Sequence, residues 1–199
     1  MHTSTPLVAA LSALVVVSAS HLGGQEPSEV QPAIRSEVRR TDVGEYILVQ
    51  EVSVDAPVAD VWAAYTTDEG WTAWASPAAE IDLRVGGTIR TAYEGIKLGE
   101  EGTNTLHIVN YVPLEVLTLK ADLSRNWPEV MQRDGDKLSN VILFDAIDDE
   151  RTRIRSFGVG YSDAPEYQNL LQFFIRANEG LFQNLKRYLE DGQRQEWSE

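Results

Sequence analysis

The sequence predicts an α+β domain in which a curved antiparallel sheet of about six to seven strands wraps around a long C-terminal helix. Short runs of β-branched and aromatic residues fill the middle of the chain, and their connections are too short for crossover helices. After Pro165 the apolar residues recur with a period of 3.6 as far as about Glu190, near Gly192. Because neither this sheet nor this helix is stable with its apolar face in water, each must cover the other.

The first strand and two short helices are predicted before Pro77. Residues 46–54 are rich in β-branched side chains and end at Asp55-Ala56-Pro57. Pro57 suits the first turn of a helix, and the apolar residues after it keep helical spacing. A second helical segment spans about residues 69–74. We expect these two helices to close one end of the sheet.

Six further strands are predicted, with glycine, proline and aspartate between them. They span residues 81–85, 88–94, 103–112, 116–123, 140–147 and 152–161. In the last hairpin, a turn centred on Asp149 places Asp145 opposite Arg153 as an exposed ion pair. Alternation would carry Phe157 to the same face as the arginines. Either a bulge near Gly158 changes the alternation, or both faces are covered there.

The organisation of the chain is predicted as a signal peptide (1–19), a disordered linker (20–42), a domain (43–192) and a C-terminal tail (193–199). Residues 7–19 form an apolar run of the length of a signal-peptide core, followed by small residues that suit cleavage. The segment before it contains no lysine or arginine. Export to the periplasm or the medium is therefore predicted, with an uncleaved N-terminal membrane anchor as the alternative.

Composition excludes several functions. There are 17 lysines and arginines against 31 aspartates and glutamates, a net charge of −14. Such a surface repels nucleic acids and anionic lipids, so no nucleic acid and no membrane insertion of the mature domain are expected. The chain has no cysteine, which excludes disulfides and thiolate ligands. Because His107 is the only histidine certain to remain after processing and no calcium-binding loop is present, no metal and no cofactor are predicted.

Several segments resemble a known superfamily. These are Val54-Asp55-Ala56-Pro57, Val61-Trp62, Trp74 and the stretch IDLRVGGTIR (81–90) with its double glycine. They resemble the SRPBCC/START-like proteins, whose fold is called helix-grip or birch-pollen-allergen-like. Within that superfamily, IVNYVPLEVL (108–117) is similar to homologues of the heat-shock ATPase activator C-terminal domain, although Leu114 departs from their pattern. The resemblance covers about residues 45–190.

This resemblance implies a cavity between the sheet and the last helix. Members of the superfamily bind lipids, hormones, polyketides and aromatic compounds, and some are enzymes, so the fold alone does not define the function. By alternation, His107 and Tyr111 share one face of their strand, which the resemblance turns inward with Tyr93. Trp127 lies in a long segment (122–137) that is either a flap over the cavity or an ordinary surface loop. The predicted ligand-binding residues are Trp74, Tyr93, His107, Tyr111, Trp127, Phe144, Ser156, Phe174 and Asn178.

Three functions remain open on the sequence. The first is an exported binder of a small hydrophobic or aromatic molecule. The second is an enzyme of the cyclase or hydratase kind, in which His107 and Tyr111 act as acid and base. The third is a protein-binding module related to the heat-shock ATPase activators, with a protein as its partner. No catalytic motif is recognisable, and we therefore rank the binder first.

Overall fold

The computed structural model describes residues 34–93, 96–123 and 127–197. Eight strands and four helices follow one another along the described chain. They are β1 (Ile34–Arg40), β2 (Tyr46–Val54), α1 (Val58–Thr66), α2 (Asp68–Trp74), β3 (Ala78–Ile81), β4 (Thr88–Ala92), β5 (Asn104–Val112), β6 (Val116–Ala121), α3 (Glu129–Asp134), β7 (Ser139–Ala146), β8 (Thr152–Tyr161) and α4 (Pro165–Asp191).

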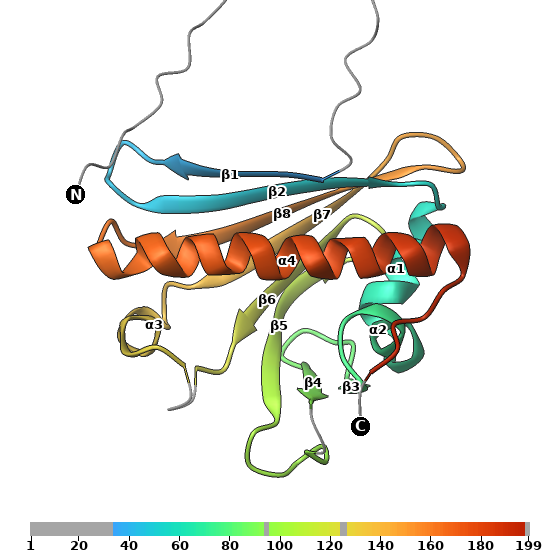
Figure 1. Cartoon of the computed structure of the whole chain (residues 1–199), viewed down its shortest axis with the longest axis horizontal. Coiled ribbons are helices and arrows are strands. Elements are labelled where there is room, and N and C mark those ends of the chain that lie inside the picture. The colour runs from blue at the N-terminus through green and yellow to red at the C-terminus, as the bar shows by residue number, and fades with distance from the viewer. Residues whose placement is uncertain (1–33, 94–95, 124–126, 198–199) are drawn as a thin grey trace, which may run out of the picture. The chain divides into compact units, whose positions relative to one another are not determined.

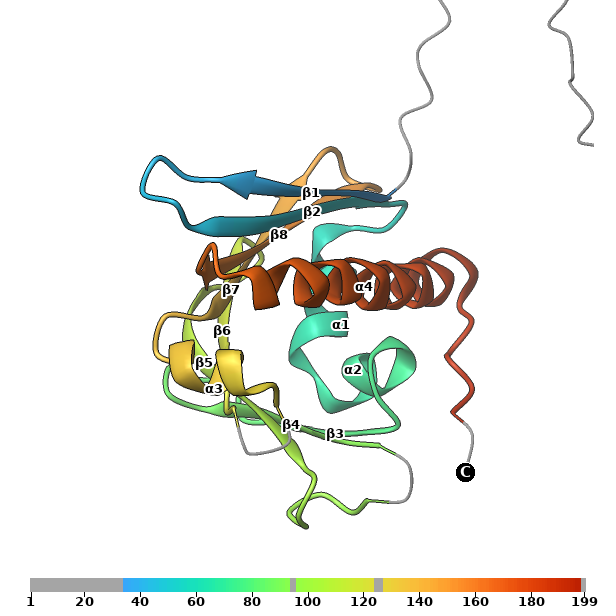
Figure 2. The same cartoon turned by 60° about the vertical axis from the view of Figure 1, so that its left-hand side comes forward.

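The strands form a single antiparallel sheet in the order β1-β2-β8-β7-β6-β5-β4-β3. The sheet curves around α4, and α1 and α2 fill the space beside the second half of that helix (Figures 1 and 2). The α+β helix-grip architecture predicted from the sequence is therefore confirmed. Eight strands are present where six to seven were expected, because the chain contributes one strand before the predicted domain start.

That additional strand is β1, which lies within the predicted linker. Residues 34–40 (IRSEVRR) pair with β2 along its length, so this part of the linker prediction is wrong. Only Ile34 and Ser36 are partly covered, and the remaining side chains of the strand are exposed. A charged edge strand is a common protection against edge-to-edge association. The same charges gave the segment the composition of a linker.

The N-terminal segment and the C-terminal tail differ in what the structure describes. The predicted signal peptide (1–19) and residues 20–33 lie outside the described residues. Within the described part, no helix is both long and apolar enough to cross a membrane. The helix α4 ends at Gly192, whose φ of 67° is left-handed. The tail then returns to α2, where the backbone N–H of Gln195 donates to the carbonyl of Ala73 at 2.7 Å.

Buried apolar residues form two clusters at the two ends of α4. The α1–α2 cluster joins both short helices to the sheet and to Phe182 and Leu185 of α4. The α3 cluster joins α3 to the first turns of α4 and to β2. Its buried members are Leu48, Val130, Met131, Leu138, Tyr167 and Leu171.

The β7–β8 hairpin has the register that the sequence predicts. Asp145 lies opposite Arg153, and its carboxylate also accepts a hydrogen bond from Arg155 Nε at 2.8 Å. The alternation of β8 then changes at a bulge. Leu48 of β2 pairs with Gly158, whereas two residues earlier in β2 the partner is Tyr161. Gly160, with φ of 89°, makes this possible, because a Cβ there would lie 2.1 Å from the carbonyl oxygen of Lys137.

Candidate functional site

A cavity lies between the inner face of the sheet and α4. It has two lobes, one of about 230 Å³ next to α3 and one of about 300 Å³ next to α2. We call them the α3 lobe and the α2 lobe. Six residues line both lobes, so the two spaces adjoin. These shared residues are Leu106, Leu119, Trp127, Asn140, Ser156 and Asn178.

Small residues on the inner face of β8 leave room for this space. Ser156 and Gly158 face α4 where β7 and β2 on either side carry larger side chains. Gly158 also accommodates the ring of Tyr161, because a Cβ there would lie 2.9 Å from the tyrosine hydroxyl. The bulge in β8 turns Tyr161 inward to line the α3 lobe. Residues 156–161 of β8 therefore leave space for the cavity and also supply Tyr161 to its lining.

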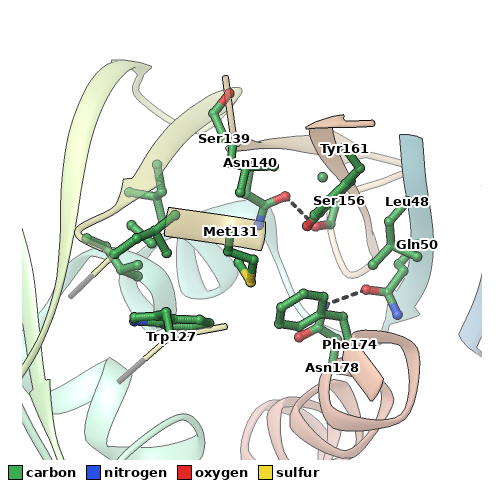
Figure 3. A pocket seen from close by; sticks show the side chains of 16 residues that line it. Leu48, Gln50, Trp127, Met131, Ser139, Asn140, Ser156, Tyr161, Phe174 and Asn178 are labelled. Atoms are coloured by element: carbon green, nitrogen blue, oxygen red, sulfur yellow. Dashed lines mark hydrogen bonds between the residues drawn. The ribbon is translucent and has the colours of Figure 1, made fainter. Parts of the chain in front are cut away.

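Two hydrogen-bonded pairs place polar groups at the junction of the lobes (Figure 3). Ser156 Oγ donates to Asn140 Oδ1 at 2.9 Å. Asn178 Nδ2 donates to Gln50 Oε1 at 2.7 Å, and Gln50 Nε2 in turn donates to Ser36 Oγ at 3.0 Å. Gln50 is only 1% exposed, so these bonds satisfy an amide that would otherwise be costly to bury. We call these residues the amide belt: Gln50, Asn140, Ser156 and Asn178.

The α3 lobe is otherwise apolar. Trp127, Met131 and Phe174 surround it in Figure 3. Met131 comes from α3 and Phe174 from α4, while Trp127 immediately precedes α3. Tyr161 contributes a phenol whose pKa burial raises to about 12, so it is neutral at pH 7. This lobe therefore offers mainly contact area to a bound molecule.

The α2 lobe is lined by aromatic residues of α1 and α2 and by Tyr93, which follows β4. Trp74 Nε1 donates to the carbonyl of Ala64 at 3.0 Å, and the hydroxyl of Tyr93 donates to the carbonyl of Ala75 at 2.9 Å. Desolvation raises the pKa of Tyr93. Trp71 Nε1 is buried without an acceptor among the described residues. Thr91 and Asn104 add a hydroxyl and an amide to a lobe that otherwise presents mainly ring surfaces.

Charged groups lie outside the cavity. Asp134 of α3 has a buried carboxylate, whose pKa is lowered first by a hydrogen bond from Arg133 and further by one from Tyr167. Asp134 does not line either lobe. Across residues 34–93, 96–123 and 127–197, no group of three or more potential ligands could hold a metal ion.

Six of the nine predicted site residues line the cavity. Trp127, Ser156 and Asn178 line both lobes, Trp74 and Tyr93 line the α2 lobe, and Phe174 lines the α3 lobe. Their role in binding remains a prediction. Two others belong to the α1–α2 cluster instead, where Phe144 and Tyr111 pack against Trp62 with ring centroids 5.4 and 6.2 Å apart.

The prediction that His107 faces the cavity is wrong. The β5–β6 register skips one residue between Ile108 and Asn110, so Val109 forms a bulge that reverses the alternation. Residues before the bulge, such as Leu106 and Ile108, therefore point inward, while His107 is exposed on the outer face. After the bulge Tyr111 turns inward, so the two side chains lie on opposite faces of the sheet. The acid–base pair proposed for an enzyme is not assembled.

The sequence did not identify several lining residues, of which Gln50 and Asn140 matter most. Gln50 could have been found, because it shares the inward alternation of Leu48 and Val52 in an otherwise apolar strand. A polar residue at such a position needs a buried partner. Asn140 gave no comparable signal, since it stands near the start of β7 beside a long connection.

An α+β helix-grip domain with a largely apolar internal cavity is the class that this architecture defines. The family described as activator of Hsp90 ATPase homolog 1-like protein matches residues 55–190. Because the match covers more than half of the chain, the protein belongs to this family, within the SRPBCC superfamily that the sequence resembles. No curated protein sequence matches the chain significantly.

Solved structures share the fold at low sequence identity. NE0264 from Nitrosomonas europaea is 18% identical with a TM-score of 0.58, covering 76% of this chain and 98% of that one. The Aha1 dimer from Colwellia psychrerythraea is 17% identical with a TM-score of 0.56, covering 73% and 97%. CalU16 from Micromonospora echinospora is 18% identical with a TM-score of 0.56, covering 81% and 77%. At these identities the likeness establishes the fold alone.

Proposed function

We propose that this domain binds a small hydrophobic or aromatic molecule between the sheet and α4. The observation that carries the proposal is that two largely apolar lobes adjoin at shared residues of the amide belt. Each lobe is larger than the roughly 150 Å³ apolar cavity that accommodates benzene in a protein core. The larger lobe, at about 300 Å³, reaches the lower end of the range of small-molecule sites.

The arrangement of the lining also supports a binding role. Apolar and aromatic walls supply most of the contact area, and Asn140, Ser156 and Asn178 place polar groups where the lobes meet. Small-molecule sites commonly combine these features, because the apolar walls give affinity and the polar groups fix orientation.

Export remains part of the proposal. The apolar run at residues 7–19 and the small residues after it support removal of a signal peptide. The exported protein would then bind its ligand outside the cytosol. Mass determination of the native protein tests this directly: a mass that lacks the first 19 or 20 residues supports cleavage, and the full-length mass contradicts it.

Protein binding is the second candidate, and the family assignment favours it. Phe173, which is 56% exposed on α4, is the large apolar side chain available to such a partner on that helix. Phe173→Ser should weaken a protein complex and leave small-molecule binding unchanged. A loss of small-molecule binding in this variant would contradict the separation of the two surfaces.

A fluorescent-probe titration tests the proposed function. N-phenyl-1-naphthylamine, an uncharged aromatic dye, is added to the full chain and its emission is followed. Leu106→Trp fills the junction of the lobes and should abolish binding. Val109→Trp is the matched control, since it introduces the same side chain on the exposed face of the same strand. Equal binding by both variants, or no binding by the unmodified protein, would contradict the proposal.

A further inference from the structure

The cavity lining carries no formal charge at neutral pH. Among the described residues that line either lobe, none is aspartate, glutamate, lysine, arginine or histidine. The polar side chains there are amides, hydroxyls, indoles and phenols. Burial raises the pKa of Tyr161 and of Tyr93, which keeps both phenols protonated. This neutrality contrasts with the rest of the chain, whose net charge is −14.

The two asparagines of the amide belt face the cavity from opposite walls (Figure 3). Asn140 projects from β7 and Asn178 from α4. Each amide uses one end in the hydrogen bonds already described, Asn140 as acceptor and Asn178 as donor. Asn140 Nδ2 and Asn178 Oδ1 have no hydrogen-bond partner among the described residues. One donor and one acceptor thus remain where the lobes meet.

We propose that the ligand is an uncharged, mostly apolar molecule that carries a hydroxyl or carbonyl group at the junction of the two lobes. This inference rests on the proposed function and adds the chemical class of the ligand. A hydroxyl group can accept from Asn140 Nδ2 and donate to Asn178 Oδ1. A carbonyl group can accept from Asn140 Nδ2. The apolar parts of the molecule then extend into the aromatic α2 lobe and the α3 lobe.

Charged molecules of the same shape are disfavoured by desolvation. A carboxylate at the junction would lose its hydration without gaining a cationic partner, and such a charge is expensive to bury. The acidic surface also repels an approaching anion. An ammonium group is attracted by that surface, but the lining offers it no carboxylate. No lining residue carries a charge that could pair with a charged ligand. Anions and cations are therefore both disfavoured at the junction.

Displacement of bound N-phenyl-1-naphthylamine by matched two-ring compounds tests this class. Naphthalene, 2-naphthol, 2-naphthoate and 2-naphthylmethylammonium are compared on the full chain at pH 7. We expect 2-naphthol to bind about 3- to 10-fold more tightly than naphthalene, because it gains hydrogen bonds at the junction. We expect 2-naphthoate and the ammonium compound to bind at least about 100-fold more weakly than 2-naphthol.

A pair of asparagine variants tests whether Asn140 causes the tighter binding of 2-naphthol over naphthalene. Asn140→Leu removes the free donor, so naphthalene and 2-naphthol should bind about equally. Asn110→Leu makes the same substitution at an exposed position of β5, outside the cavity, and should keep the preference. Circular dichroism confirms that each variant is folded. If Asn140→Leu does not fold, the probe series on the unmodified protein decides.

The outcomes separate this inference from the proposed function. If 2-naphthoate displaces the dye as well as 2-naphthol does, the cavity binds small molecules but the ligand class is wrong. The ligand class is also wrong if the hydroxyl gives no advantage over naphthalene. If the dye does not bind at all, or binds equally to Leu106→Trp, the proposed function fails and this inference fails with it.

Discussion

The two ends of α4 are packed in different ways. At its C-terminal end, the rings of Tyr65, Trp71 and Trp74 lie with centroids 4.9 to 6.1 Å apart, and Phe144 packs edge-on against Tyr65. At its N-terminal end, the smaller α3 cluster contains polar contacts of the Tyr167 hydroxyl, to Asp134 Oδ2 at 3.2 Å and to the carbonyl of Val130 at 3.3 Å. The cavity lies between them. The C-terminal end of α4 thus packs against a cluster of aromatic rings. At the N-terminal end, the short helix α3 borders the α3 lobe.

This contrast indicates that side chains buried away from the cavity, such as Phe144, contribute to stability alone, whereas Tyr65, Trp71 and Trp74 also line the α2 lobe. Tightly interlocked rings cannot be truncated without leaving a void, whereas residues that already border a cavity have fewer contacts to lose. Substitutions in the α1–α2 cluster should therefore change the free energy of unfolding. Substitutions around the α3 lobe should change ligand affinity.

The largest expected effect is the loss of stability when Phe144 is truncated. This residue belongs to the α1–α2 cluster and is 4% exposed. Phe144→Ala should lower the free energy of unfolding by about 3–5 kcal/mol in a urea titration. Phe174→Ala, at the cavity wall, should cost about 1 kcal/mol or less and weaken binding of the dye. Similar losses of stability for both variants would show that the two ends are packed alike.

The next effect is pH-dependent and concerns Asp134. Its folded pKa is lowered, so its contribution to stability is present above its unfolded pKa of about 4 and is lost as the pH falls through the lower folded pKa. Asp134→Asn should lower Tm by about 4 °C at pH 7. This difference from the unmodified protein should shrink as the pH is lowered below about 4. A difference that stays constant across this acid range would contradict a charge-dependent role.

A smaller effect is expected at Trp197 in the C-terminal tail. Its indole Nε1 donates to the carbonyl of Thr72 at 3.1 Å, and its ring lies edge-on to Tyr93 with centroids 6.4 Å apart. Trp197→Ala should lower Tm by about 2–3 °C, because one hydrogen bond and one ring contact are lost. Trp197→Phe, which keeps the ring contact, should lose less. An unchanged Tm in both variants would mean that the tail does not stabilise the α2 end.

The smallest expected effect is a gain of stability at Leu114. This residue has a φ of 67° in the β5–β6 turn, a conformation that disfavours side chains with a Cβ. Leu114→Gly should raise Tm by about 1–2 °C, since relief of strain exceeds the added freedom of the unfolded chain. Val112→Gly, in the adjacent strand, should lower Tm. A decrease for Leu114→Gly would show that its side chain contributes more than the strain costs.

Much of the fold could be predicted because its signals are local. Residues 46–54 and 152–161 are identified as strands with the bounds that the structure has. The long helix is identified by its period. By contrast, β1 was missed because an edge strand with one partner needs few apolar residues. The short helix α3 was also missed, since six residues in a charged segment give no periodic signal.

The site was less predictable because its geometry depends on bulges. Alternation predicts which face a side chain occupies only in a regular strand, and one extra residue at Val109 reversed it between His107 and Tyr111. For the bulge that turns Tyr161 inward, the sequence offers two alternatives without deciding between them. Bulges are set by neighbouring strands and turns, which a single sequence does not define. Cavity residues on α4 were easier to identify, since helical spacing is not interrupted there.

The most direct measurement is a map of the dye's position in solution. Proton–nitrogen correlation spectra of the full chain are recorded with and without N-phenyl-1-naphthylamine. We predict shifts in the side-chain amides of Asn140 and Asn178 and in the backbone amides of Leu106 and Ser156. Shifts confined to the outer face of the sheet, around Val109, or no shifts at all, would contradict a binding cavity between the sheet and α4.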